Sequence, residues 1–160
     1  MTEVRLDQIA VVHSGGRLKL SGDHFVEDGV PAYGAGGHNG FLDTAEYEDR
    51  EALILSSIGA RCGKCFYVQG SWTSLANTQV ILPDRSRVDA RFLWYQLNDE
   101  GRWPRSGSAQ PFIKPSDVKA NQVWLPALDE QLRIAAILDH ADALRIKRLQ
   151  ALVHLGRVSE

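Results

Sequence analysis

The sequence has no excess of charge of one sign and no long hydrophobic run. Its 18 basic and 20 acidic residues give a formal net charge of −2, which excludes a uniformly basic nucleic-acid-binding protein but allows a local basic surface. No stretch approaches the roughly 18 consecutive apolar residues that a transmembrane helix needs. The first seven residues include two acids and no apolar core, so we expect no secretory signal and no membrane partner.

Cysteine is scarce, with Cys62 and Cys65 as the only two, so we expect a reducing, cytoplasmic environment rather than a disulfide scaffold. Their C-x-x-C spacing leaves open a small cytosolic thiol or zinc protein. A zinc site usually needs two further ligands, and the five histidines are isolated in the sequence. A redox C-x-x-C would begin a helix, whereas Phe66–Val68 has the pattern of a strand. We therefore predict no metal site and no cofactor.

Known catalytic motifs are missing as well. The sequence contains no H-E-x-x-H zinc motif, no G-x-S-x-G nucleophile elbow, no phosphate-binding P-loop and no Asn-Pro-Pro-Tyr motif of DNA methyltransferases. The acids Glu46, Glu48, Asp49 and Glu51 lie beside Arg50 and have the pattern of a solvated surface. No paired acid–base site can be argued from these residues.

Short elements broken by glycine, proline, asparagine and aspartate occupy residues 1–125. The apolar runs Ala52–Ser56, Lys64–Val68 and Thr78–Leu82 predict strands. Asp89 can cap a helix over Ala90–Asn98, which Gly101 would follow. This pattern predicts an α+β domain with a small, mainly antiparallel β-sheet and helices.

Residues 126–160 have a different pattern, that of one long coiled-coil-type helix with Asp129 as its N-cap. Apolar residues recur at alternating spacings of three and four, interrupted only by Arg148: Ile134, Ile137, Ala141, Leu144, Ala151, Leu155 and Val158. Acids dominate its first half and bases its second, which favours an antiparallel partner helix. Of these residues we predict that Ile134, Ile137, Ala141, Leu144 and Leu155 make a dimer. The alternative is that the helix docks on its own domain.

Several motifs resemble one protein family in the order that the family shows. Pro126–Asp139 is similar to the pattern P-x-L-x-E-Q-x-x-I-x-x-x-L, Val30–Phe41 to a Pro-x-Tyr-Gly-x-Gly-Gly motif, and Ser106–Pro111 to a Ser-Gly-Ser-Ala-Gln-Pro motif. Over nearly its whole length the chain resembles the specificity subunits of type I restriction-modification systems.

That resemblance implies a DNA-reading function without chemistry. A full specificity subunit has two target recognition domains, held apart by two antiparallel helices, and each domain reads one half of a split double-stranded DNA site. The subunit positions the DNA methyltransferase (modification) subunits and, in the larger complex, the restriction subunit. This sequence has one recognition domain (1–125) and one dimerisation and spacer helix (126–160). We therefore expect a half-subunit that pairs with a second recognition half or copy, or a piece of a longer subunit.

Polar and basic side chains in the loops of residues 1–125 are the candidates for DNA contact, since loops on a rigid scaffold carry recognition groups. They are His38, Asn39, Arg61, Lys64, Thr73, Arg102, Arg105, Ser106, Ser108, Gln110 and Lys114. The alternatives are ordinary surface loops, a tight glycine turn at Gly34–Gly40, and a Gln110 amide that holds its own loop. An oligomerisation adaptor that binds no DNA also stays open.

Overall fold

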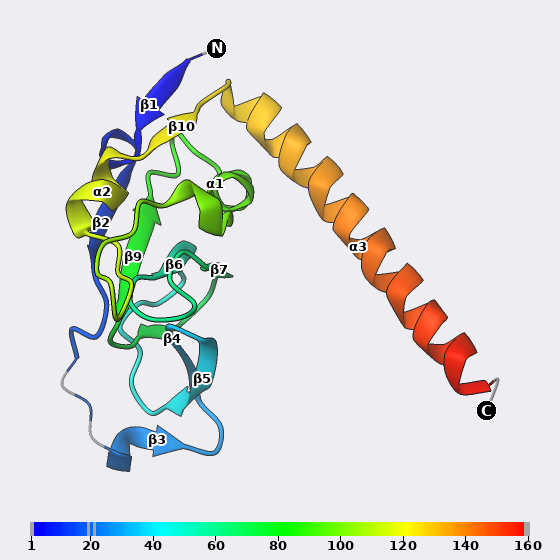
Figure 1. Cartoon of the computed structure of the whole chain (residues 1–160), viewed down its shortest axis with the longest axis horizontal. Coiled ribbons are helices and arrows are strands. Elements are labelled where there is room, and N and C mark those ends of the chain that lie inside the picture. Colours follow the sequence, from blue (N-terminus) through cyan, green and yellow to red (C-terminus); the bar gives the residue numbers. More distant parts are fainter. Residues whose placement is uncertain (1, 19, 21, 159–160) are drawn as a thin grey trace.

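The structure, a computed structural model, describes residues 2–18, 20 and 22–158. A mixed α+β domain forms first along the chain, and one long helix, α3 (Leu128–Val158), extends from it as a single rod (Figure 1). This arrangement confirms the predicted α+β class with a long C-terminal helix. None of the described helices is long and apolar enough to cross a membrane.

The centre of the domain is a four-stranded antiparallel sheet with the strand order β2-β9-β6-β7. Its strands are β2 (Ala10–Ser14), β9 (Thr78–Pro83), β6 (Ala52–Ser56) and β7 (Cys65–Val68). The strands expected from the sequence all belong to this sheet. Every residue of β6 is buried, which explains why this strand is a continuous apolar run without polar alternation.

Apolar side chains of the central sheet alternate between two hydrophobic clusters. Leu53 and Ile81 belong to the larger cluster, which includes residues from the helices of the domain. Ile54 and Val80 belong to a second cluster around Trp72. Trp72, which pairs with Tyr47 just before β8, is fully buried and is therefore a core residue.

A second four-stranded sheet lies at the end of the domain that is far from the start of α3 (Figure 1). In spatial order its strands are β3 (Phe25–Val26), β5 (Gly37–Leu42), β4 (Val30–Gly34) and β8 (Thr73–Ser74). Among the described strands, only the β4–β8 pair is parallel. The prediction of a mainly antiparallel architecture is confirmed, although the strands form three sheets instead of one.

The third sheet is a single antiparallel pair, β1 (Glu3–Arg5) with β10 (Gln122–Trp124). It places the beginning of the described chain beside the segment that leads into α3. The backbone N–H of Leu125 also donates to the carbonyl of Thr2 at 2.9 Å. The segment that leads into α3 is therefore hydrogen-bonded to the first described residues of the domain.

Helix α1 (Ala90–Leu97) forms where the sequence predicts it. The Asp89 carboxylate accepts a hydrogen bond from the Phe92 backbone N–H at 2.8 Å, as an N-cap does. Phe92 and Leu97 are buried against the central sheet. The remaining helical segments are η1 (Leu6–Gln8), η2 (Gly22–His24), η3 (Glu100–Arg102) and α2 (Pro115–Ala120).

Helix α3 begins at Leu128, so the prediction of Asp129 as its N-cap is wrong. Asp129 lies in the first helical turn together with Glu130. Both acids still interact favourably with the positive end of the helix dipole. The 31 residues of the helix correspond to a length of roughly 45 Å.

The beginning of α3 docks on the domain, which the sequence pattern only offered as an alternative. Gln131 is fully buried and Ala135 is 5% exposed. Ile134, expected in the dimer seam, is partly buried against the larger core cluster of the same chain. From residue 143 to residue 157 every side chain is exposed. The helix therefore has a docked first part and an overhanging second part.

Candidate nucleic-acid interface

The Ser-Gly-Ser-Ala-Gln-Pro loop lies directly against the turn that follows β6. The Gly59 N–H donates to the Pro111 carbonyl at 2.9 Å, and the Ile113 N–H donates to the Ser57 carbonyl at 2.9 Å. Ser106 and Phe112 form a backbone bridge that closes the loop on itself. Residues 57–64 and 106–113, which are distant in sequence, are thereby joined into one surface.

The β4–β5 hairpin reaches the same surface. The Arg61 side chain donates to the Gly36 carbonyl at 3.4 Å. Gly37 has a φ of 97°, and a Cβ atom there would lie 2.9 Å from the Phe66 ring. This position needs glycine because the hairpin tip is a tight turn packed on β7. The structure thus supports the tight-turn interpretation of the glycine-rich segment.

Most of the predicted contact side chains around these three segments face solvent. Two side chains are half-buried, Lys64 and Ser106, and five are exposed: His38, Asn39, Arg61, Ser108 and Gln110. Lys114 is also exposed, at the N-cap of α2 just after the loop. These residues come from four separate positions in the chain, and the hydrogen bonds of residue 61 with 36, 59 with 111 and 113 with 57 link the segments that carry them.

The shape of the 106–111 loop comes from its backbone. Gly107 has a φ of 84°, and a Cβ atom there would lie 2.5 Å from the Gln110 carbonyl oxygen. Within the described part of the chain, the Gln110 side-chain amide makes no hydrogen bond. The amide is therefore exposed for contact with another molecule and does not hold the loop in shape.

Thr73 does not belong to this surface, contrary to the expectation. Its side chain is fully buried. The Thr73 hydroxyl donates to the Thr44 carbonyl at 2.8 Å and accepts from the Glu46 N–H at 3.1 Å. These bonds fasten the segment before β6 to β8. A buried hydroxyl with both roles occupied cannot contact DNA.

Arg102 is a second correction, because its guanidinium group is used inside the domain. It donates to the Asn121 side chain at 2.7 Å, to the Gln96 carbonyl at 3.2 Å, and to the Gln122 carbonyl. Burial lowers the pKa of Arg102, although Asp99 and Glu3 act in the opposite direction. The side chain therefore joins the end of α1 to β10.

Arg105 is exposed but also bound within the chain. Its guanidinium donates to the Cys62 carbonyl at 2.9 Å and to the Glu100 carbonyl at 3.1 Å. Arg105 thus joins the turn at residues 59–64 to η3 through hydrogen bonds. We place it among the residues that shape the interface. Arg61 and Lys114 are exposed cations there, although Arg61 also donates to the Gly36 carbonyl.

The two cysteines are core residues. Cys62 and Cys65 are free thiols, both buried, and Cys62 donates to the Ser57 carbonyl at 3.6 Å. Burial raises the pKa of both thiols, which disfavours the reactive thiolate. Among the described residues, no group of three or more His, Cys, Asp or Glu side chains is placed to hold a metal ion.

One aromatic residue at this surface was not singled out by its sequence. Phe112 is 37% exposed, and its backbone pairs with both Ile58 and Ser106. A phenylalanine that follows a proline in a polar loop is the only signal that could have marked it. An exposed aromatic ring beside polar side chains is common where a protein contacts another molecule.

Comparison with known proteins gives one consistent result. The chain matches the sequence profile of the family described as the type I restriction modification DNA specificity domain over residues 1–153. It is similar to the type I restriction enzyme EcoprrI specificity subunit of Escherichia coli, with 26% identity over 115 residues. That match covers 71% of this chain and 28% of the relative.

Two solved structures share the fold of this chain. The type I restriction-modification S subunit of M. genitalium has a TM-score of 0.71 and 20% identity, covering 98% of this chain and 42% of that subunit. The HsdS subunit of Thermoanaerobacter tengcongensis has a TM-score of 0.65 and 20% identity, covering 93% and 39%. The chain therefore spans less than half the length of the relatives that it matches.

Proposed function

The chain belongs to the type I restriction modification DNA specificity domain family, and from this premise we propose that it reads one half of a bipartite DNA target. The observation that carries the proposal is the joining of the hairpin tip, the 57–64 turn and the 106–113 loop into one surface. That surface presents exposed cationic and amide side chains on a backbone held by hydrogen bonds. Rigid loops of this kind suit the reading of base edges.

Each exposed group has a recognition chemistry. The guanidinium of Arg61 suits a guanine edge or a phosphate, and the amides of Asn39 and Gln110 suit the donor–acceptor pair of adenine. The ammonium of Lys114 suits a phosphate. The hydroxyl of Ser108 can donate to or accept from either. We assign no catalytic role to any of them.

The overall charge suggests that the chain needs a partner to hold DNA. The net charge is −2, and only a few bases lie on the proposed surface. Few neutralised phosphates mean weak affinity for the isolated chain. In the proposed assembly a methyltransferase subunit supplies further phosphate contacts, and the restriction subunit joins through the complex.

We assign the exposed side of α3 to pairing with a second recognition half, either another copy or a related domain. Ile137, Leu144 and Leu155 are each more than half exposed, and Ala141 lies on the same side of the helix. Acids in the first half of α3 and bases in the second half favour an antiparallel arrangement. Residues 1–125 would then read DNA while residues 126–160 hold the two halves apart.

Selection from a randomised DNA pool tests this function. The chain is purified in complex with its cognate methyltransferase subunit, and bound duplexes are sequenced. We expect a motif with two short specified blocks and an unspecified spacer. A variant that carries Asn39→Ala, Arg61→Ala and Gln110→Ala should lose the block that this surface reads, whereas Arg145→Ala on the exposed part of α3 should not.

The experiment also separates the alternative functions. An assembled complex that enriches no motif would overturn the proposal. If the chain still formed oligomers in that case, it would be an adaptor that does not bind DNA. Gel filtration of the complex before selection shows that the partners are assembled and that a missing motif has not resulted from dissociation.

A further inference from the structure

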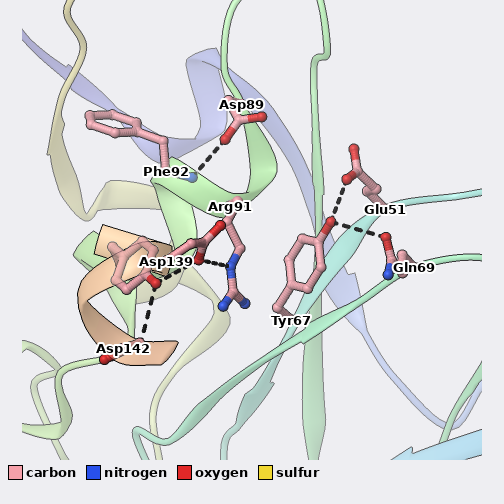
Figure 2. Close-up of polar contacts among 9 residues, drawn as sticks. Glu51, Tyr67, Gln69, Asp89, Arg91, Phe92, Asp139 and Asp142 are labelled. Carbon is pink, nitrogen blue, oxygen red and sulfur yellow. Dashed lines mark hydrogen bonds and ion pairs between the residues drawn. The ribbon is translucent and has the colours of Figure 1, made fainter. Parts of the chain in front are cut away.

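One acid on α3 is held by two side chains of α1. Asp139 accepts from the Arg91 guanidinium at 2.7 Å and from the Tyr95 hydroxyl at 2.6 Å. Tyr95 also reaches Asp142, one turn further along α3, at 3.3 Å. Figure 2 shows Asp139 joined to Arg91. We call Asp139, Arg91 and Tyr95 the Asp139 clamp.

Aromatic rings hold the arginine of the clamp in place. The Arg91 guanidinium carbon lies 4.5 Å from the centre of the Trp94 ring, 5.1 Å from that of Tyr67 and 5.3 Å from that of Tyr95. The Tyr67 hydroxyl in turn donates to Glu51 (Figure 2). A guanidinium enclosed by rings loses little further freedom when it binds a carboxylate. The clamp is thus connected to the central sheet through β7.

The clamp lies where the docked part of α3 ends, so a small change of angle there displaces the end of the helix. The docked part of the helix extends from the buried Gln131 to Asp142, and the clamp lies at its far end. Every side chain from residue 143 to residue 157 is exposed, and these 15 residues extend over roughly 22 Å. A tilt of about 10° at the clamp would move the end of the helix by roughly 4 Å, which is close to the 3.4 Å rise of one base pair.

We propose that Asp139, Arg91 and Tyr95 fix the angle between the recognition domain and α3, and thereby select the number of base pairs between the two half-sites. The clamp residues are positioning residues that do not touch DNA. The effect on the spacer between half-sites rests on the proposed function, whereas the effect on the angle of α3 concerns the chain alone. Gln131 anchors the start of the helix and the clamp determines its direction.

The chain alone allows a direct test of the geometry. Spin labels at Ser71→Cys on the domain and Gln150→Cys on α3 report the distance between two exposed positions, while Cys62 and Cys65 stay buried. Labelled chain is diluted with unlabelled chain so that only distances within one chain contribute. We expect a narrow distance distribution for the parent and a broader one for Asp139→Asn.

The matched control is Asp129→Asn, which removes an exposed acid from the same helix. This control should leave the distribution narrow. Tyr95→Phe removes one hydrogen-bond donor to Asp139 and keeps the ion pair with Arg91. The width of its distance distribution should therefore lie between those of the parent and Asp139→Asn. Circular dichroism verifies that each variant keeps its helix content. An equally narrow distribution in folded Asp139→Asn would overturn the clamp.

The second test uses DNA and the assembled complex. Duplexes carry the selected half-sites with spacers lengthened or shortened by one base pair. A half-exposed ion pair contributes up to about 1 kcal/mol, so Asp139→Asn should lower the preference for the best spacer by about fivefold. The half-site sequences themselves should be read as before. If the preference for the best spacer does not change, the clamp has no role in spacing.

The two tests fail separately. If the parent complex selects no DNA motif, the proposed function is wrong, and the distance measurement still decides whether the clamp directs the helix. If the parent selects a bipartite motif but Asp139→Asn changes neither the distances nor the spacer preference, only the clamp proposal is wrong.

Discussion

The side-chain oxygen of Gln131 accepts a hydrogen bond from the Asp89 backbone N–H at 2.9 Å, and so joins the start of α3 to the cap of α1. The amide nitrogen of Gln131 donates to the Arg87 carbonyl at 3.0 Å and to the Pro126 carbonyl at 2.8 Å. Both the oxygen and the nitrogen of this fully buried amide therefore have hydrogen-bond partners. The glutamine of the Glu-Gln motif is thus a structural anchor between domain and helix.

Replacing Gln131 should destabilise the protein. Gln131→Ala leaves three partly buried backbone groups without their partner and removes a fully buried side chain, so we expect the free energy of unfolding to fall by about 2 to 4 kcal/mol. Gln150→Ala, at an exposed position on the same helix, should change it by less than about 0.5 kcal/mol. Urea denaturation followed by circular dichroism measures both. Equal stabilities of the two variants would show that the anchor contributes nothing.

Arg61 and Arg102 should separate DNA contact from structure. In the complex with the methyltransferase subunit, Arg61→Ala should reduce the dependence of log affinity on log salt by about one phosphate contact. Arg102→Ala should leave that slope unchanged and lower the free energy of unfolding by about 1 to 3 kcal/mol, because it removes several internal hydrogen bonds. Fluorescence anisotropy at several salt concentrations gives the slopes. If Arg102→Ala changed the salt dependence and Arg61→Ala lowered the free energy of unfolding, Arg102 would be the DNA contact and Arg61 the structural residue.

Leu144 should be needed for association of the helices. It is 54% exposed on the overhanging part of α3, on the side with Ile137 and Leu155. Leu144→Asp places a charge in the proposed seam and should convert dimers to monomers in sedimentation equilibrium. Gln150→Asp adds the same charge outside the seam and should leave the dimer intact. A parent chain that is monomeric at all concentrations tested would contradict self-association.

Asp139 should contribute to stability only above acidic pH. Burial alone would raise the pKa of Asp139, but the hydrogen bonds from Tyr95 and Arg91 and the arginine charge outweigh it, so the pKa is lowered. Such a group stabilises the fold above its unfolded pKa of about 3.9, and this contribution disappears as the pH falls through the folded pKa. The stability difference between the parent and Asp139→Asn should therefore be constant near neutral pH and shrink below about pH 4.

Tyr95 should stay a hydrogen-bond donor throughout that range. Burial and the hydrogen bond to Asp139 raise the pKa of Tyr95 to about 12. Unfolding curves of the parent and Asp139→Asn at a series of pH values measure the difference between their free energies of unfolding. A difference that grew as the pH fell would contradict the assigned sign.

The cysteines should react only after unfolding. Cys62 and Cys65 are buried and their thiol pKa values are raised, so few thiolates are present at pH 8. A thiol reagent should modify both at the rate of unfolding, and faster in urea. Rapid modification of the native protein, or stoichiometric zinc in the purified protein, would favour the thiol or zinc alternative.

Local patterns in the sequence were sufficient for three strands of the central sheet, for α1 and for α3. Ala52–Ser56 is a strand because it is apolar on both faces, Asp89 caps α1, and an apolar period without proline, and without glycine before Gly156, makes one long helix. These elements follow from hydrogen bonding and side-chain spacing within a few residues. The same patterns could not show that Ile134 packs on its own domain, because a helical period fixes the side of a residue and not its partner.

Tertiary structure alone decided which loop side chains are free for another molecule. Arg61 and Arg102 look alike in the sequence, yet Arg102 binds acceptors at Gln96, Asn121 and Gln122. Those acceptors come close only after α1 and β10 have packed. The sequence by itself determined the strands β6, β7 and β9, the helices α1 and α3, and the family motifs. The fold decided which donors are already satisfied, because buried and half-buried polar groups take whichever backbone partners the packing places beside them.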